Sequence, residues 1–146
     1  MTELLTITRT FTAPRELVFD VWTSPKHFGV WFGGEDVTVP LDSIEMDLRE
    51  GGSWKATMQI PGGHEIHWVG EYVELDRPTH LVFTLTDDPS SDDRSTITVD
   101  LAESTGGTEM TMSQTVDGFP PEGIEQLRAG YGSFFDAIEK LLATLT

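Results

Sequence analysis

The fold is decided by PEGIEQLRAGYGSFFDAIEKLLATL, residues 121–145. Apolar residues recur in this stretch at intervals of three and four, which is the spacing of one face of an α-helix. The members of that face are Ile124, Leu127, Tyr131, Phe134, Phe135, Ile138, Leu141, Leu142 and Leu145. The pattern predicts a helix over roughly residues 121–144. At 1.5 Å per residue such a helix is roughly 35 Å long, about the width of a strongly bent sheet.

The chain before this stretch has the period of two that is typical of half-buried β-strands. Trp54, Ala56 and Met58 alternate with polar residues, and the same alternation recurs between Val37 and Val116. Short turns rich in glycine and proline separate the runs, which predicts six consecutive strands in an antiparallel meander. A β-rich segment at about residues 3–11 predicts a seventh strand.

Two short helices are predicted in FTAPRELVFDVWTSPKHFGVWFGG, residues 11–34. Pro14 suits the first position of a helix, and the residue before Pro25 disfavours helical backbone, so the first helix should end near Ser24. We expect Ser24 to cap a second helix that begins with Pro25 and ends at Gly33-Gly34. The segment carries four large aromatic residues: Trp22, Phe28, Trp31 and Phe32.

One seven-stranded sheet with one long helix predicts a single α+β domain over residues 1–146, in which the sheet curls around the helix. One helix cannot fill a curled sheet completely, so we expect a cavity between the two. The two short helices should close one end of this space with their aromatic residues.

The composition limits the partners and the compartment. The chain has 146 residues and no cysteine, and its 25 acidic and nine basic side chains give a formal net charge of −16. Nucleic acid and anionic membrane surfaces repel such a protein, so we expect it to bind neither. It shows no signal peptide and no apolar run of about 18 residues that could span a bilayer, which favours a cytoplasmic protein.

No motif for catalysis, metal binding or a cofactor stands out. His64 and His67 are three residues apart on a predicted strand, so their side chains should point to opposite faces and cannot share a metal. The loop DDPSSDD, residues 87–93, lacks the spacing of a calcium-binding loop. There is no nucleophile elbow and no phosphate-binding loop. We therefore expect no metal and no cofactor, and the residues favour a protein that is not an enzyme.

The alternation also predicts which side chains face the cavity. On the strand at residues 64–75, either Ile66, Trp68 and Tyr72 or Val69 and Val73 point inward. We favour the first set because Gly70, between Trp68 and Tyr72, leaves room for a ligand or for the helix. The residues expected to bind a ligand are Trp31 at the mouth of the cavity, with Trp54, Met58, Trp68, Tyr72, Phe83, Met112, Tyr131 and Phe135.

Arg9 is a candidate polar anchor. It shares parity with Ile7 and Phe11, which we expect to face inward. A buried guanidinium must be paired. The partner is either a carboxylate of the protein, such as Glu71 or Glu74, or the acidic head of a ligand.

Four segments, at residues 9–33, 46–58, 70–85 and 130–141, resemble a known family: RTFTAPRELVFDVWTSPKHFGVWFG, MDLREGGSWKATM, GEYVELDRPTHLVFTL and GYGSFFDAIEKL. They are similar to the small bacterial form of the activators of the heat-shock-protein-90 ATPase, a family within the SRPBCC superfamily of birch-pollen-allergen and START-type domains. This resemblance implies the helix-grip fold and a link to chaperones and stress response. The family usually has Trp-Trp where this chain has Trp31-Phe32, and Gly-Trp where it has Gly130-Tyr131.

Three functions follow from these observations. The inferred cavity favours a carrier or sensor of a small apolar molecule, acting as a monomer or homodimer. The resemblance implies, as an alternative, a co-chaperone that activates a heat-shock-protein-90 ATPase by protein–protein contact. A cyclase-like or dehydratase-like enzyme is the third possibility, with only Arg9, His67, Tyr72 and Gln114 available as polar groups.

Overall fold

The computed structural model describes residues 3–34, 37–88, 90 and 94–145. Its elements in chain order are β1 (Leu4–Phe11), α1 (Arg15–Thr23), α2 (Pro25–Trp31), a short 3₁₀ helix η1 (Leu41–Ser43), β2 (Glu45–Met46), β3 (Ser53–Ile60), β4 (His64–Asp76), β5 (His80–Leu85), β6 (Ser95–Ser104), β7 (Gly107–Thr115) and α3 (Pro121–Leu145). The predicted order of one strand, two helices, six strands and one long helix is confirmed.

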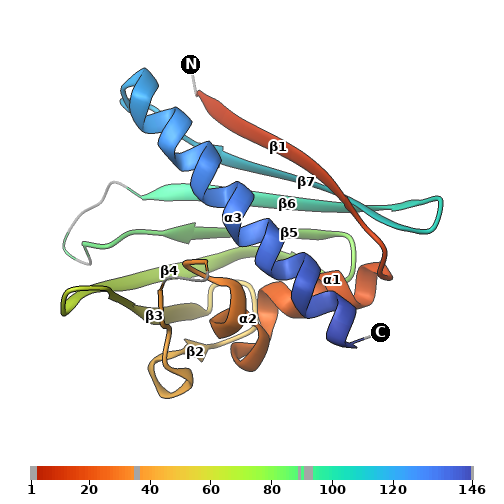
Figure 1. The fold of residues 1–146 in the computed structure, drawn as a ribbon, viewed down its shortest axis with the longest axis horizontal. Coiled ribbons are helices and arrows are strands. Elements are labelled where there is room, and N and C mark those ends of the chain that lie inside the picture. The colour runs from red at the N-terminus through yellow and green to blue at the C-terminus, as the bar shows by residue number, and fades with distance from the viewer. Residues whose placement is uncertain (1–2, 35–36, 89, 91–93, 146) are drawn as a thin grey trace.

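The seven strands form one antiparallel sheet in the order β1-β7-β6-β5-β4-β3-β2. Strands β2 to β7 follow one another as a meander, and β1 returns to pair with β7, with Leu4 opposite Thr115 and Phe11 opposite Thr108. Helix α3 crosses the concave face of the sheet, and α1 and α2 pack beside its C-terminal half (Figure 1). The α+β class and the sheet that curls around the last helix are therefore confirmed.

Three local predictions are corrected. Pro14 lies one residue before α1, in extended backbone, and the helix begins at Arg15. Ser24 occupies the capping position of α2, but its side chain makes no capping hydrogen bond. The first of the six strands predicted between Val37 and Val116 was expected from the alternation of Ile44, Met46 and Leu48, but it is only the two-residue strand β2. The backbone turns after β2, where the Arg49 amide donates to the Asp47 carbonyl, so Leu48 is left 50% exposed.

The aromatic residues of α1 and α2 fill one end of the space under α3. The rings of Trp22 and Trp31 lie 4.7 Å apart, and those of Phe28 and Phe32 lie 4.4 Å apart. The Trp31 indole donates a hydrogen bond of 2.7 Å to the Val21 carbonyl, which satisfies its one polar group. This end of the interior is therefore a packed aromatic cluster, in which ring pairs set edge to face are favourable.

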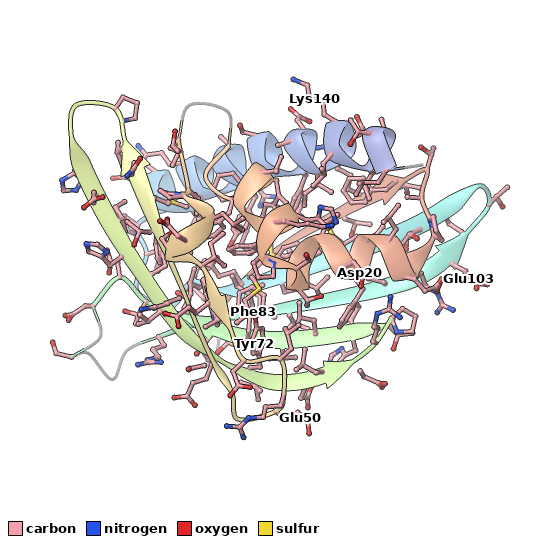
Figure 2. All side chains as sticks on the ribbon, turned by 90° about the horizontal axis from the view of Figure 1, so that it is seen from below. Asp20, Glu50, Tyr72, Phe83, Glu103 and Lys140 are labelled. Atoms are coloured by element: carbon pink, nitrogen blue, oxygen red, sulfur yellow. The ribbon has the colours of Figure 1, made fainter. Side chains whose placement is uncertain are left out.

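Side chains fill most of the space between the sheet and the helices, while Lys140 projects from the outer side of α3 (Figure 2). On β4, Tyr72 is buried and Val73 is 49% exposed, which confirms the predicted facing of Ile66, Trp68 and Tyr72. The Tyr72 ring lies 6.4 Å from that of Phe83 on β5. Phe135 packs against the same core from the α3 side and is completely buried.

Gly70 makes room for the protein's own backbone rather than for a ligand or for α3. A Cβ at this position would overlap the carbonyl oxygen of Thr84 and the indole nitrogen of Trp54. These two atoms form a hydrogen bond of 2.9 Å directly over Gly70. The missing side chain therefore lets three strands meet at one point.

Gly70→Ala should destabilise the protein by about 3 kcal/mol or more, since the added methyl group must displace a backbone carbonyl and break the Trp54 hydrogen bond. Gly130→Ala is the matched control. No atom lies within 4 Å of its added Cβ, so it should gain about 0.5–1 kcal/mol from helix propensity. Urea denaturation measures both changes. Equal stabilities for the two variants would contradict the packing argument.

His80 is held between two carboxylates. Its Nδ1 lies 2.6 Å from Asp100 Oδ1 on β6, and its Nε2 lies 2.6 Å from Glu74 Oε2 on β4. The alternation along β5 puts His80 on the face of the sheet away from α3, because its neighbour Leu81 is buried. The hydrogen bonds to Asp100 and then to Glu74 raise the pKa of His80 above its ordinary value of 6.5.

This raised pKa predicts a loss of stability with rising pH. The imidazolium of His80 is favoured in the folded state, so its contribution is fully present below the unfolded-state pKa of about 6.5 and is lost as the pH rises through the folded-state pKa. The free energy of unfolding should therefore fall over this window in the wild type, relative to His80→Gln. Taking the difference removes the opposite effect of His27, whose pKa is lowered chiefly by burial. A difference that does not change with pH would contradict the prediction.

Candidate functional site

A cavity of about 370 Å³ lies between the sheet and the N-terminal half of α3. Its lining consists of Phe32, Met58, Trp68, Leu85, Thr86, Asp87, Ser95, Gln114, Phe119, Leu127, Tyr131 and Phe134. Most of these side chains are buried or half-buried, and the exposed ones, Asp87 and Phe119, mark its mouth. The cavity therefore lies at the end of the sheet–helix space that α1 and α2 do not fill.

The cavity walls follow from helix and strand geometry. Leu127, Tyr131 and Phe134 are four and three residues apart, so they lie on one face of α3. Met58 pairs with Ile66 across β3 and β4, and Trp68 is two residues further along β4 on the same face. The cavity is thus bounded on one side by α3 and on the other by the inner face of the sheet.

Four aromatic rings form a continuous wall on one side of the cavity. The rings of Tyr131 and Phe134 lie 5.6 Å apart, those of Phe134 and Phe32 lie 6.1 Å apart, and those of Phe32 and Trp68 lie 6.2 Å apart. Successive rings are inclined by 56–75°, so the wall is curved rather than flat. Phe32 also stacks on Phe28, which joins this wall to the aromatic cluster of α1 and α2.

The lining has one buried polar pair. The Tyr131 hydroxyl donates a hydrogen bond to Gln114 Oε1. Burial raises the pKa of Tyr131, so its hydroxyl stays protonated and acts as a donor. The Trp68 Nε1 is also buried, and it has no hydrogen-bond partner among the described residues. Such a donor is costly when it is left unmet.

The predicted ligand-binding residues fall into three groups. Met58, Trp68 and Tyr131 line the cavity. Trp54, Tyr72 and Phe83 surround a second space, together with Trp22, Phe28 and Met46, but this space is too small for a water molecule. Trp31, Met112 and Phe135 line neither space and are almost completely buried. The expected residues therefore do not surround one continuous cavity, and Trp31 does not lie at a mouth.

Several lining residues were not predicted to bind a ligand. Thr86 and Asp87 follow β5, Ser95 begins β6, and Phe119 follows β7, so they reach the cavity from the ends of strands or from the segments beyond them. Alternation says nothing about such segments. The one available signal was Phe119, a large aromatic residue among turn residues in DGFPP.

Two lining residues have a further interest. The resemblance described above implies that the family usually has a different aromatic residue at positions 32 and 131, and Phe32 and Tyr131 both line the cavity.

Arg9 points toward α3, as its parity predicts, but its partners differ from those expected. Its Nη2 lies 2.7 Å from Asp136 Oδ1 and 3.6 Å from Glu139 Oε2. The predicted pairing with Glu71 or Glu74 is wrong, because three strands separate β1 from β4 in the sheet. Arg9 does not line the cavity.

The histidines of the β3–β4 hairpin lie away from the cavity. His64 and His67 are both exposed, and His67 Nδ1 lies 3.0 Å from the Thr57 hydroxyl. Within the part of the chain that the structure describes, no three His, Asp or Glu side chains are grouped as metal ligands. Residues 89 and 91–93 of the acidic loop lie outside that part. In the same described ranges, no helix has the length and apolar character needed to cross a membrane.

The polar pair generates a stability prediction. Tyr131→Phe should cost about 1–2 kcal/mol, because it leaves the buried Gln114 oxygen without its donor. The double variant Tyr131→Phe/Gln114→Met should recover part of this loss, since both partners are then apolar. Tyr72→Phe is the matched control, because the Tyr72 hydroxyl makes no hydrogen bond among the described residues. Additive losses in urea denaturation would mean that the two groups do not interact.

The chain is similar to known proteins in sequence and in structure. The sequence profile of the family described as Activator of Hsp90 ATPase homolog 1-like protein matches residues 12–143. Among curated proteins, none is significantly similar in sequence. A solved structure of a protein from Chromobacterium violaceum has a TM-score of 0.83 at 23% identity and covers 95% of this chain and 96% of that one.

Two solution structures are similar to the same degree. An AHSA1-like protein from Aeromonas hydrophila has a TM-score of 0.82 at 20% identity, with 98% and 94% of the two chains covered. A protein from Staphylococcus epidermidis has a TM-score of 0.82 at 25% identity, with 100% and 93% covered. Since the family match extends over nearly the whole chain and the fold agrees with it, this protein belongs to the AHSA1-like family of the SRPBCC superfamily.

Proposed function

We propose that this protein binds a small, largely apolar molecule in the cavity between the sheet and the N-terminal half of α3. The observation that carries the proposal is a space of about 370 Å³ that is lined mainly by apolar and aromatic side chains. Ligand pockets in proteins usually have about 300–1,000 Å³ and combine such a lining with a few polar groups. Here the polar groups are the Tyr131–Gln114 pair, at which an occupant could be oriented.

Binding without catalysis is the better-supported reading of this lining. The titratable side chains that line the cavity are Tyr131 and Asp87. Burial raises the pKa of Tyr131, so its hydroxyl stays protonated and is not available as a base, and Asp87 is exposed at the mouth. Arg9 and His67, which an enzyme of the cyclase or dehydratase kind was expected to use, lie outside the lining.

The family description supports a second candidate, activation of a chaperone ATPase by protein–protein contact. This activity needs no open cavity, so the two candidates can be separated. Stimulation of a purified heat-shock-protein-90 ATPase that persists when the cavity is filled would favour the second. Saturable binding of a small molecule that disappears when the cavity is filled would favour the first.

Leu127→Trp tests the proposal by filling the cavity. The wild type should bind N-phenyl-1-naphthylamine, a neutral dye that fluoresces in apolar surroundings, at one site with a dissociation constant on the order of 10 µM. The larger indole should occupy the volume that the dye needs and weaken binding by about tenfold or more. Fluorescence titration measures the affinity, and circular dichroism checks the fold.

Leu141→Trp is the matched control for this experiment. Leu141 is also a half-buried leucine of α3, but it does not line the cavity, so the variant should bind the dye as the wild type does. No saturable binding by the wild type, or equal losses in the two variants, would overturn the proposal.

A further inference from the structure

We infer that the preferred occupant of the cavity is a hydrophobic cation, such as a small aromatic or alkyl amine, rather than a hydrophobic carboxylate. This inference rests on the proposed function, because it names the charge class of a ligand for the same cavity. It comes from three features of the lining and its surroundings: the aromatic rings, the charge at the mouth and the net charge of the chain.

The first feature is the aromatic share of the lining. Five lining residues are aromatic: Phe32, Trp68, Phe119, Tyr131 and Phe134. The face of an aromatic ring carries partial negative charge, so it attracts an ammonium group and repels a carboxylate. The curved wall from Tyr131 to Trp68 presents successive rings at different inclinations, which suits a compact cationic head better than a flat stack would.

The second feature is the charge at the mouth. Asp87 is the charged side chain of the described lining, and it is exposed at the rim. A neighbouring depression shares Ser95 and Phe119 with the cavity and adds one cation, Arg94, and one anion, Asp117. The Arg94 guanidinium lies 3.9 Å from the Glu71 carboxylate, so that carboxylate partly offsets its charge.

Two features favour an anion, and they are weaker. The unpartnered Trp68 N–H would suit a carboxylate oxygen, but a carbonyl, hydroxyl or ether oxygen of a cation would satisfy it equally well. The N-terminus of α3 carries a partial positive charge, but Glu122 in its first turn opposes it. Neither feature adds a full positive charge to the lining.

The third feature acts over a longer range. The formal net charge of the chain is −16, so cations are concentrated near its surface and anions are depleted. Gln114 does not discriminate at short range, because its Oε1 has a second lone pair for an ammonium group and its Nε2 can donate to a carboxylate.

Three naphthalene compounds of nearly equal size test the inference. They are 1-naphthylmethylamine, which is cationic at neutral pH, the neutral 1-naphthalenemethanol and the anionic 1-naphthoate. Each is titrated in competition with the neutral dye used above. The amine should bind about tenfold more tightly than the carboxylate, and the alcohol should lie between them. Raising the salt concentration to about 0.5 M should narrow the gap.

The variant Asp87→Asn tests whether the Asp87 carboxylate causes the preference for the amine over the carboxylate. Because Asp87 is exposed, this variant should fold as the wild type does, and it should weaken amine binding about threefold and alcohol binding by less. Asp42→Asn is the matched control, because Asp42 is an exposed carboxylate in η1 that does not line the cavity. It should change neither affinity.

The outcomes separate this inference from the proposed function. If the alcohol displaces the dye but the carboxylate binds as tightly as the amine, or Asp87→Asn does not affect the amine, the charge class is wrong and the binding site stands. If neither the dye nor the alcohol binds, the proposed function fails, and the inference fails with it.

Discussion

The structure depends on a mismatch between one helix and the sheet that surrounds it. Helix α3 has 25 residues, and it is the one long helix that covers the concave face of a seven-stranded sheet. A helix is about 10 Å across with its side chains, so it cannot fill a curved sheet of this width. The remaining space must be filled by other side chains or left open. In this protein the aromatic residues of α1 and α2 fill the end nearer the C-terminus of α3, and the other end is left open.

The two ends of the interior therefore differ in what they contribute: the filled end contributes to stability, and the open end forms the cavity. The filled end holds three of the largest fully buried side chains, Trp31, Phe28 and Phe135, and close packing there contributes to stability. The open end is lined by residues that lose fewer contacts when they are changed, because part of their surface faces a void. Phe32 belongs to both ends, since it stacks on Phe28 and also lines the cavity. Apart from residues such as Phe32 and Tyr131 that also have partners in the packed interior, the lining can therefore vary at a smaller cost to stability than the filled end.

Much of the fold could be predicted from the sequence, because alternation and helical spacing depend only on which side chains reach the core. The direction of Arg9 followed from parity. Parity left two facings open for the strand at residues 64–75, and the correct one, with Trp68 and Tyr72 inward, was chosen because of Gly70. What could not be predicted depends on which strands are neighbours. Arg9 pairs with Asp136 because α3 crosses beside β1, and Gly70 is needed because the Thr84 carbonyl of β5 lies over it. Trp54, Phe83 and Met112 were expected to line the cavity but do not, because parity cannot tell a side chain that packs against another from one that borders a void.

The pairing of β1 with β7 has a consequence for how the chain reaches this structure. Leu4 lies opposite Thr115, so β1 pairs with a strand that is synthesised much later than β1 itself. The meander from β2 to β7 can form by pairing strands that are close in sequence. The pairing of β1 with β7 cannot form until β7 has been synthesised. Contacts between distant parts of a chain slow folding, and unpaired strand edges invite association with other chains. Until β1 has paired, the edge of β7 is unpaired, and the new protein can associate with other chains through it.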